Sequence, residues 1–186
     1  ESINALKELT ITLLGKRAKR NALEIESSEP ILKINNIGAV EAINLSTRMF
    51  AHQMIEEAMI AANICAITFV KNSIGISINR FHDKPDTDKL LALFEKFQSL
   101  GLKKSDDPII LLQRCIEIAK RSENATSLQS LILQGLPRAI YSSKKSGHFG
   151  LQLKEYSHFT SPIRRYPDLI IHRLIKSILK KEKVHF

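Results

Sequence analysis

The chain has 186 residues, of which 44% are hydrophobic, enough to bury the core of one ordinary domain or of a large piece of one. Its formal net charge of +9 favours a polyanionic partner. A membrane is disfavoured in that role because the longest apolar run, residues 58–70, is too short to span a bilayer and is interrupted by Asn63. Cys65 and Cys115 show no CxxC pattern and no zinc-type histidine spacing, so they are predicted to be buried free thiols, without a disulfide partner, in a reducing compartment.

The first third of the chain is predicted to form a helix, a hairpin and a long buried helix. Apolar residues at helical spacing predict the first helix over residues 2–14. Short strands are predicted at residues 22–26, 31–34 and 40–44. The last two are joined by an Asn-Asn-Ile-Gly turn and should form a hairpin. The long helix is predicted over residues 47–71, and its apolar composition on nearly every side indicates burial.

Two charged features of this region leave alternatives open. The basic run of residues 16–20 is either a solvated helix end, with cations near the negative pole of the helix, or a phosphate contact. Glu56 and Glu57 either lie on the wet end of the long helix or enter its buried part. A buried carboxylate must find a cation, a hydrogen-bond donor or a metal.

The middle of the chain is predicted to supply scaffold. A strand is predicted over residues 74–81, followed by a small acidic cluster that lacks the glycine and the terminal glutamate of a calcium loop. Within this cluster Asp86 is interpreted as the N-cap of a helix that Gly101 closes. Further helices are predicted from Asp107 and over about residues 127–139. The fold class is therefore α+β, a mixed sheet with a short hairpin covered by helices.

The stretch from His148 to His172 carries the most polar chemistry of any segment. Thr160-Ser161-Pro162 is a helix start signal, and Pro167 just beyond it predicts a kink or a short preliminary turn. Arg164, Asp168 and His172 then fall at i, i+4 and i+8, on one helix face. A carboxylate beside an imidazole would fix the arginine to meet a phosphate, whereas the alternative is an ordinary ion pair on a solvated helix.

Aromatic and basic side chains alternate in the same region. This pattern suits a single-stranded nucleic acid, whose phosphates attract cations and whose bases stack on flat rings. Tyr141 and His148 are expected to line a groove. The sequence contains no GxSxG, HExxH, Walker or GxGxxG motif, and the SxxK at residues 142–145 lacks its companion motifs.

Several of these motifs together point to a family. The runs HFGL at residues 148–151 and SHFTSPIRRYPD at residues 157–168, followed by His172, resemble the signature of the ribonuclease II and ribonuclease R family. Upstream, IEEAMIAANICA at residues 55–66 and NRFHDKPDTDKL at residues 79–90 are also similar to that family, in the same order. The resemblance implies that residues 1–186 are the C-terminal portion of an RNB catalytic domain. Such enzymes are processive 3′ to 5′ exoribonucleases that hydrolyse single-stranded RNA to nucleoside 5′-monophosphates by metal-assisted chemistry.

The resemblance also implies roles for individual residues. Arg164 matches the family's catalytic arginine, which offsets charge on the phosphate, and Asp168 and His172 are expected to hold it in place. A glutamate, with Glu57 favoured over Glu56, is expected to approach the ribose near the RNA 3′ end. The substrate-contacting residues expected in this way are Glu57, Glu56, Arg165, Tyr141, His148 and Tyr166.

One departure from the family limits these implications. The family holds its metal ions on an aspartate cluster of the type DxxxxxDxDD, and none of the six aspartates here has that spacing. We therefore expect no metal ligand in this chain, magnesium in the full-length protein, and no activity from the chain alone. RNA helicases or other RNA-decay proteins are candidate partners, and the expected location is cytoplasmic. The alternative is a non-catalytic RNA-binding or protein-docking module derived from an RNB domain.

Overall fold

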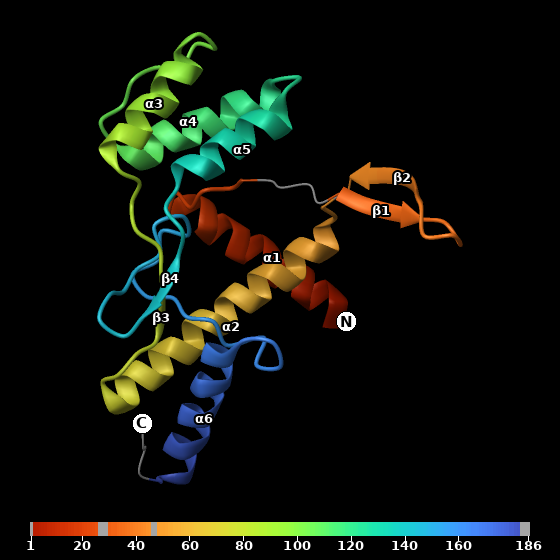
Figure 1. The fold of residues 1–186 in the computed structure, drawn as a ribbon. Helices are drawn as coiled ribbons and strands as arrows, with labels where there is room; N and C mark the ends of the chain where they lie inside the picture. Colours follow the sequence, from red (N-terminus) through yellow and green to blue (C-terminus); the bar gives the residue numbers. More distant parts are fainter. Residues whose placement is uncertain (1, 26–29, 46–47, 183–186) are drawn as a thin grey trace. The chain divides into compact units, whose positions relative to one another are not determined.

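The computed structural model describes residues 2–25, 30–45 and 48–182, and the chain divides into two compact units. The first unit contains residues 1–23, 54–86 and 137–186, and the second contains residues 24–53 and 87–136. Each unit combines helices with a short two-stranded antiparallel sheet (Figure 1). The helix-rich α+β class expected from the sequence is confirmed, but the described strands form two small antiparallel sheets in place of the expected mixed sheet.

The first unit is built on three helices and a small sheet. They are α1 (Ser2–Lys19), all but the first turn of α2 (Phe50–Ile74), β3 (Asn79–Phe81), β4 (Ile140–Ser142) and α6 (Tyr166–Lys180). The predicted strand over residues 74–81 shrinks to β3, because α2 continues to Ile74 and ends at Gly75, which has a φ of 70° that favours glycine. The predicted start of α2 at Thr47 lies outside the described residues. β3 pairs antiparallel with β4, and a parallel bridge between His82 and His148 extends the arrangement.

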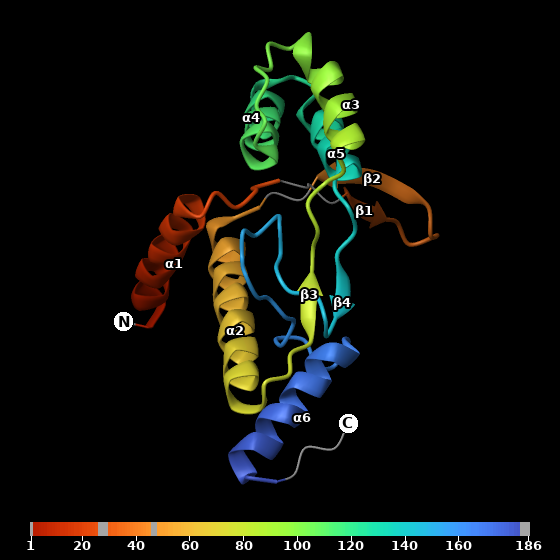
Figure 2. The same ribbon diagram turned by 90° about the vertical axis from the view of Figure 1, so that its left-hand side faces the viewer.

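The hydrophobic core of the first unit lies where the C-terminal half of α2 crosses α6 (Figure 2). Ala66, Ile67 and Val70 of α2 pack with Ile171 and Leu174 of α6. These positions recur three or four residues apart, so each helix presents a single apolar stripe to the other. By length and composition alone α2 could cross a membrane, a test that the core helices of soluble proteins also pass.

The second unit contains a hairpin and three helices. The hairpin of β1 (Pro30–Ile34) and β2 (Val40–Leu45) is confirmed, and Asn35 closes its turn by accepting hydrogen bonds from the amides of Ile37 and Ala39. Residues 22–25 form no strand, and Glu26, the end of the strand predicted there, lies outside the described residues. The three helices are α3 (Thr87–Gln98), α4 (Pro108–Arg121) and α5 (Ala125–Gly135).

The three helices of the second unit pack through fully buried apolar side chains. Phe97 of α3, Leu112 of α4 and Ile132 of α5 are each at most 1% exposed. The helix predicted from Asp107 is confirmed as α4, and the Asp107 carboxylate caps it by accepting a hydrogen bond from the Ile109 amide at 2.8 Å. Cys115 is buried in α4, and burial raises the pKa of its thiol to about 12. Their role as scaffold stays a prediction.

Replacing Ile171 by alanine should lower the free energy of unfolding by about 2–5 kcal/mol, because the substitution leaves a cavity in the core between α2 and α6. Leu179 lies on the same helix but is 69% exposed, so Leu179→Ala should change stability by no more than about 0.5 kcal/mol. Urea unfolding followed by circular dichroism measures both. Equal effects of the two substitutions would contradict the described packing of α6.

Candidate functional site

The segment before α6 forms a turn, and the helix predicted from Thr160 starts only at Tyr166. The amides of Arg164 and Arg165 donate to the carbonyl of Ser161 at 3.3 and 3.1 Å, which closes the turn. Pro167 occupies the first turn of α6, where proline is tolerated because no amide donor is needed there. The short preliminary turn expected from Pro167 is therefore confirmed, and the helix start at Thr160 is wrong. Arg164 does not lie on α6.

Asp168 holds Arg165 rather than Arg164, which corrects the expected pairing. Its side chain is completely buried, and Oδ1 accepts a hydrogen bond from Nη2 of Arg165 at 2.7 Å. The same oxygen accepts from the Ser161 amide at 2.9 Å, so one carboxylate fixes both the turn and an arginine that follows it. The reason is that Arg164 belongs to the turn, so the i, i+4 geometry expected between it and Asp168 does not arise. Its side chain is exposed.

His172 and Asn63 hold the strand-like segment that leads into this turn. Nε2 of His172 lies 2.9 Å from the carbonyl oxygen of Phe159, and its ring stacks on the Phe159 ring at 4.2 Å. His172 therefore orders the main chain. The contact with Arg164 that was expected from the sequence is not formed. Asn63, buried in α2, donates to the hydroxyl of Tyr156 at 2.9 Å and accepts from the Phe159 amide at 2.8 Å. The sequence signal for Asn63 was a polar residue inside an otherwise apolar stretch.

Tyr141 and Arg80 reach the same region from the small sheet. The Tyr141 hydroxyl lies 2.7 Å from Nδ1 of His158, and the guanidinium of Arg80 lies over the Tyr141 ring, 4.8 Å from its centroid. Burial lowers the pKa of His158 to about 4, and the positive charges of Arg165, Arg80 and Arg164 act in the same direction. The imidazole is therefore neutral at pH 7. Arg80 and His158 were not among the predicted site residues.

The two glutamates of α2 are bound by an arginine of α1. Nη1 of Arg17 lies 2.6 Å from Glu57 and 2.9 Å from Glu56, and these hydrogen bonds raise the pKa of Arg17 although burial opposes them. The side chain of Glu57 is 2% exposed and that of Glu56 is 38% exposed. The preference for Glu57 as the residue that faces a ligand is therefore not supported by the geometry, because only Glu56 presents part of its carboxylate to solvent.

Half of the basic run thus points inward, which neither of the two alternatives predicted. Besides Arg17, Arg20 donates from Nε to the carbonyl of Leu151 at 2.9 Å, while Lys16 and Lys19 are exposed. The partner of Arg17 lies 40 positions away in sequence, so only the packing of α1 beside α2 reveals the pair.

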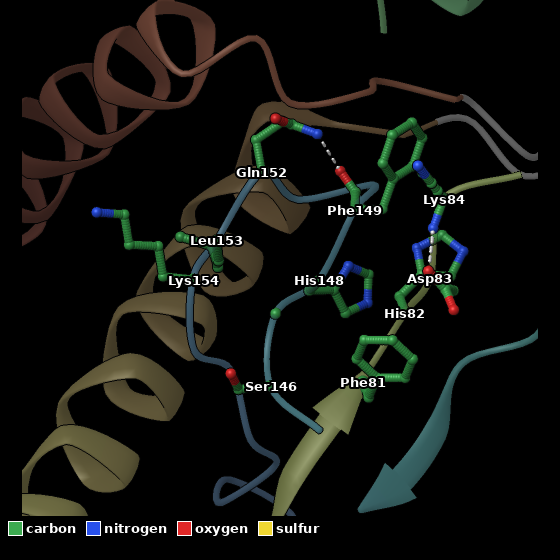
Figure 3. A pocket seen from close by; sticks show the side chains of 11 residues that line it. Phe81, His82, Asp83, Lys84, Ser146, His148, Phe149, Gln152, Leu153 and Lys154 are labelled. Atoms are coloured by element: carbon green, nitrogen blue, oxygen red, sulfur yellow. Dashed lines mark hydrogen bonds between the residues drawn. The ribbon is translucent and has the colours of Figure 1, made fainter. Parts of the chain in front are cut away.

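The HFGL motif forms one wall of a groove of ≈ 440 Å³ (Figure 3). The imidazoles of His82 and His148 accept hydrogen bonds through Nδ1 from the amides of Gly150 and Leu151, at 3.1 and 3.2 Å. A Cβ at Gly150 would lie only 3.2 Å from the His82 ring, so any larger residue here would push that ring aside by a few tenths of an ångström. Figure 3 shows aromatic rings from β3 and from the motif gathered on one side of the groove. The residues that line it include Phe81, His82, Lys84, His148, Phe149 and Lys154.

Side chains that could ligate a metal do not gather at one point among the described residues. Across residues 2–25, 30–45 and 48–182, no three His, Cys, Asp or Glu side chains come together in a way that could hold an ion. The buried carboxylates of Asp168 and Glu57 are already bound to arginines. The described residues therefore do not fit the metal site that the family uses.

Cys65, expected to be buried, is exposed.

The sequence matches the RNB domain family over residues 1–181, so the chain belongs to that family. Among named relatives, ribonuclease R of Escherichia coli is 39% identical over 187 residues. The alignment covers 98% of this chain but only 23% of that protein. The chain thus spans about a quarter of the length of this relative.

Solved structures agree with this assignment. The apo form of Mycoplasma genitalium RNase R superposes with a TM-score of 0.86 at 26% identity, over 98% of this chain and 30% of that one. The same protein in complex with ribose-methylated single-stranded RNA gives 0.82 at 27% identity, over 95% and 28%. Yeast Ssd1, a pseudonuclease, superposes with a TM-score of 0.71 at 19% identity, over 100% of this chain and 24% of that one. This likeness concerns the fold alone.

Removing the Asp168 carboxylate should destabilise the turn. Asp168→Ala leaves the Arg165 guanidinium and the Ser161 amide without their partner, and we expect a loss on the order of 3 kcal/mol, the low end for a broken buried ion pair because Arg165 is 20% exposed. Asp88→Ala, at an exposed position of α3, is the matched control and should be nearly neutral. Urea unfolding tests both, and a loss below 1 kcal/mol for Asp168→Ala would contradict the anchoring role.

Stability should fall as the pH falls from about 6.5 to about 4. Burial lowers the pKa of His148 to about 4 and that of His158 to about 4, and it also lowers the pKa of His82. The unfolded chain binds protons at these residues near pH 6.5, whereas the folded chain does so only at lower pH. Acidification therefore stabilises the unfolded state relative to the folded state and lowers the free energy of unfolding. Urea midpoints between pH 7.5 and 4.5 measure this loss. His148→Gln should flatten the profile, the exposed His52→Gln should not, and identical slopes for both would contradict the assignment.

Proposed function

We propose that this chain is part of a 3′ to 5′ exoribonuclease that hydrolyses single-stranded RNA to nucleoside 5′-monophosphates, and that it supplies the arginines that contact the scissile phosphodiester. The observation that carries the proposal is the Arg164–Arg165 pair, which lies at the end of a turn held by buried Asp168 and by the segment that Asn63 and His172 order. Membership of the RNB domain family and the likeness to ribonuclease R support it. The RNA complex of M. genitalium RNase R supports RNA as the ligand.

The two arginines would act differently. Arg164 is exposed and stays accessible to a phosphate, where a fixed positive charge offsets the charge that develops during in-line displacement. Arg165 is bound by Asp168, keeps 20% of its side chain exposed and would contact the substrate from one set orientation. The ordered turn is important because a phosphate contact contributes to the rate only when it is already positioned as the transition state forms.

The remaining contacts would distinguish RNA and hold its bases. Tyr141 is 37% exposed and Tyr166 is 67% exposed, so both rings can stack on bases. The partly exposed side chain of Glu56 can accept a hydrogen bond from a ribose 2′-hydroxyl, which favours RNA over DNA. The buried carboxylate of Glu57 would position Arg17, to which Glu56 is also bound. His148 would line the groove of the HFGL motif as a neutral wall residue.

Other aspects of the proposal concern the whole protein. Magnesium would be bound by residues outside the described part of this chain, because the described residues offer no fitting ligand group. The chain alone would then be inactive. A cytoplasmic location and association with RNA helicases or other RNA-decay proteins belong to the same proposal.

A second candidate is a non-catalytic RNA-binding or docking module. The specific observation in its favour is the lack of a metal-ligand group among the described residues, and the same fold occurs in Ssd1, a pseudonuclease. The two candidates differ in the sequence that precedes this chain in the complete protein. An aspartate cluster of the DxxxxxDxDD type there supports the nuclease, and a complete protein without it supports the module.

Replacing Arg164 by alanine in the complete protein should lower kcat on a single-stranded RNA oligomer by at least about 100-fold, the usual cost of one transition-state contact. RNA affinity should fall far less, because other cations remain. The control is Arg173→Ala, which removes an exposed arginine of α6 and should leave kcat unchanged. A fluorescent RNA oligomer reports both cleavage and binding. Full activity of Arg164→Ala, or degradation of RNA by residues 1–186 alone, would overturn this assignment.

A further inference from the structure

The charges of three arginines act on one neutral imidazole in the first unit. The charges of Arg165, Arg80 and Arg164 all act on His158, and the single carboxylate that acts on it is that of Asp168. Asp168 is hydrogen-bonded to Arg165 at 2.7 Å. Among the described residues, Arg80 and Arg164 take part in no ion pair. This corner of the molecule therefore carries excess positive charge that its own carboxylates do not compensate.

Arg80 is held in a way that leaves its hydrogen-bond donors available. Its amide donates to the carbonyl of Tyr156 at 2.7 Å, and in the β3–β4 ladder it is paired directly with Tyr141. The guanidinium lies over the Tyr141 ring at 4.8 Å, and the Tyr141 hydroxyl is in turn bound to His158. Stacking on an aromatic face orients a guanidinium but uses none of its five N–H groups. No hydrogen bond from these groups is present within the described part of the chain.

We propose that Arg80, with Arg164 and the edge of Tyr141, forms a second phosphate-binding site, which takes a backbone phosphodiester of single-stranded RNA next to the one that is cleaved. This inference rests on the proposed function and extends it to a residue outside the arginine-bearing turn. The Arg80 fork binds the phosphate oxygens, Arg164 supplies a second positive charge, and the edge of the Tyr141 ring contacts the adjacent base or ribose. A planar guanidinium suits a phosphate because two N–H groups can donate in parallel.

The alternative role of Arg80 is structural, as a cation that only packs on Tyr141. Substitutions separate the two roles. Arg80→Lys keeps the charge but loses the flat contact with the ring, whereas Arg80→Gln keeps most of the length and loses the charge. A phosphate site should tolerate lysine better than glutamine, because a lysine still releases counterions from the RNA. A purely structural role should affect thermal unfolding and leave the salt dependence of binding unchanged.

The test is binding of a fluorescent single-stranded RNA to the complete protein over a series of salt concentrations. We expect Arg80→Ala and Arg80→Gln to raise Kd about tenfold. They should also reduce the slope of log K against log salt by about 0.7, the value for one phosphate contact on a single strand. Arg80→Lys should keep most of the slope. Arg173→Ala removes the same charge from α6 and should change neither quantity.

The outcomes distinguish this inference from the proposed function. If Arg164→Ala weakens RNA binding while Arg80→Gln and Arg80→Ala keep the wild-type Kd and slope, the second phosphate site is excluded. If the wild-type protein shows no salt-sensitive RNA binding at all, the proposed function itself fails. Urea midpoints of the variants show whether each is folded, and Arg80→Lys and Arg80→Gln provide the comparison if Arg80→Ala does not fold.

Discussion

The candidate site depends on one carboxylate that has no contact with water. A buried charge is costly unless it is paired and hydrogen-bonded, and Asp168 meets this requirement by binding both the Ser161 amide and the Arg165 guanidinium. The same interaction closes the turn and places Arg164 at its outer side. The position of the proposed phosphate contact is thus fixed by the energetics of a buried charge a few residues away.

The same principle recurs between α1 and α2. The Glu57 carboxylate is buried and is bound by Arg17, which leaves the neighbouring Glu56 partly exposed. In both places a buried carboxylate neutralises one arginine and fixes it. Arg80 and Arg164 take part in no ion pair among the described residues, and the charges of both act on His158. The chain carries a formal net charge of +9, but packing decides where positive charge is available to a polyanion.

Histidines hold several main-chain segments of this arrangement through hydrogen bonds. His82 and His148 accept main-chain amides of the HFGL motif, and His172 is hydrogen-bonded to the segment before the turn. An imidazole can accept a hydrogen bond only while that nitrogen is unprotonated. His82 and His148 therefore act as structural acceptors, and the site keeps its shape because burial disfavours their charged form.

The sequence by itself determined the family, the helix-rich class, the β1–β2 hairpin, the start of α4 and the segment that carries the candidate site, because these depend on local periodicity and on residues close together in the chain. It did not determine which arginine Asp168 binds, since that depended on whether the helix began before or after the RR pair. Nor could it find the partners of Glu57 or the place of Arg80, whose contacts join residues about 40 and 60 positions apart. Those contacts exist only because α1 packs beside α2 and β3 pairs with β4, and long-range packing of this kind is decided by the tertiary structure alone.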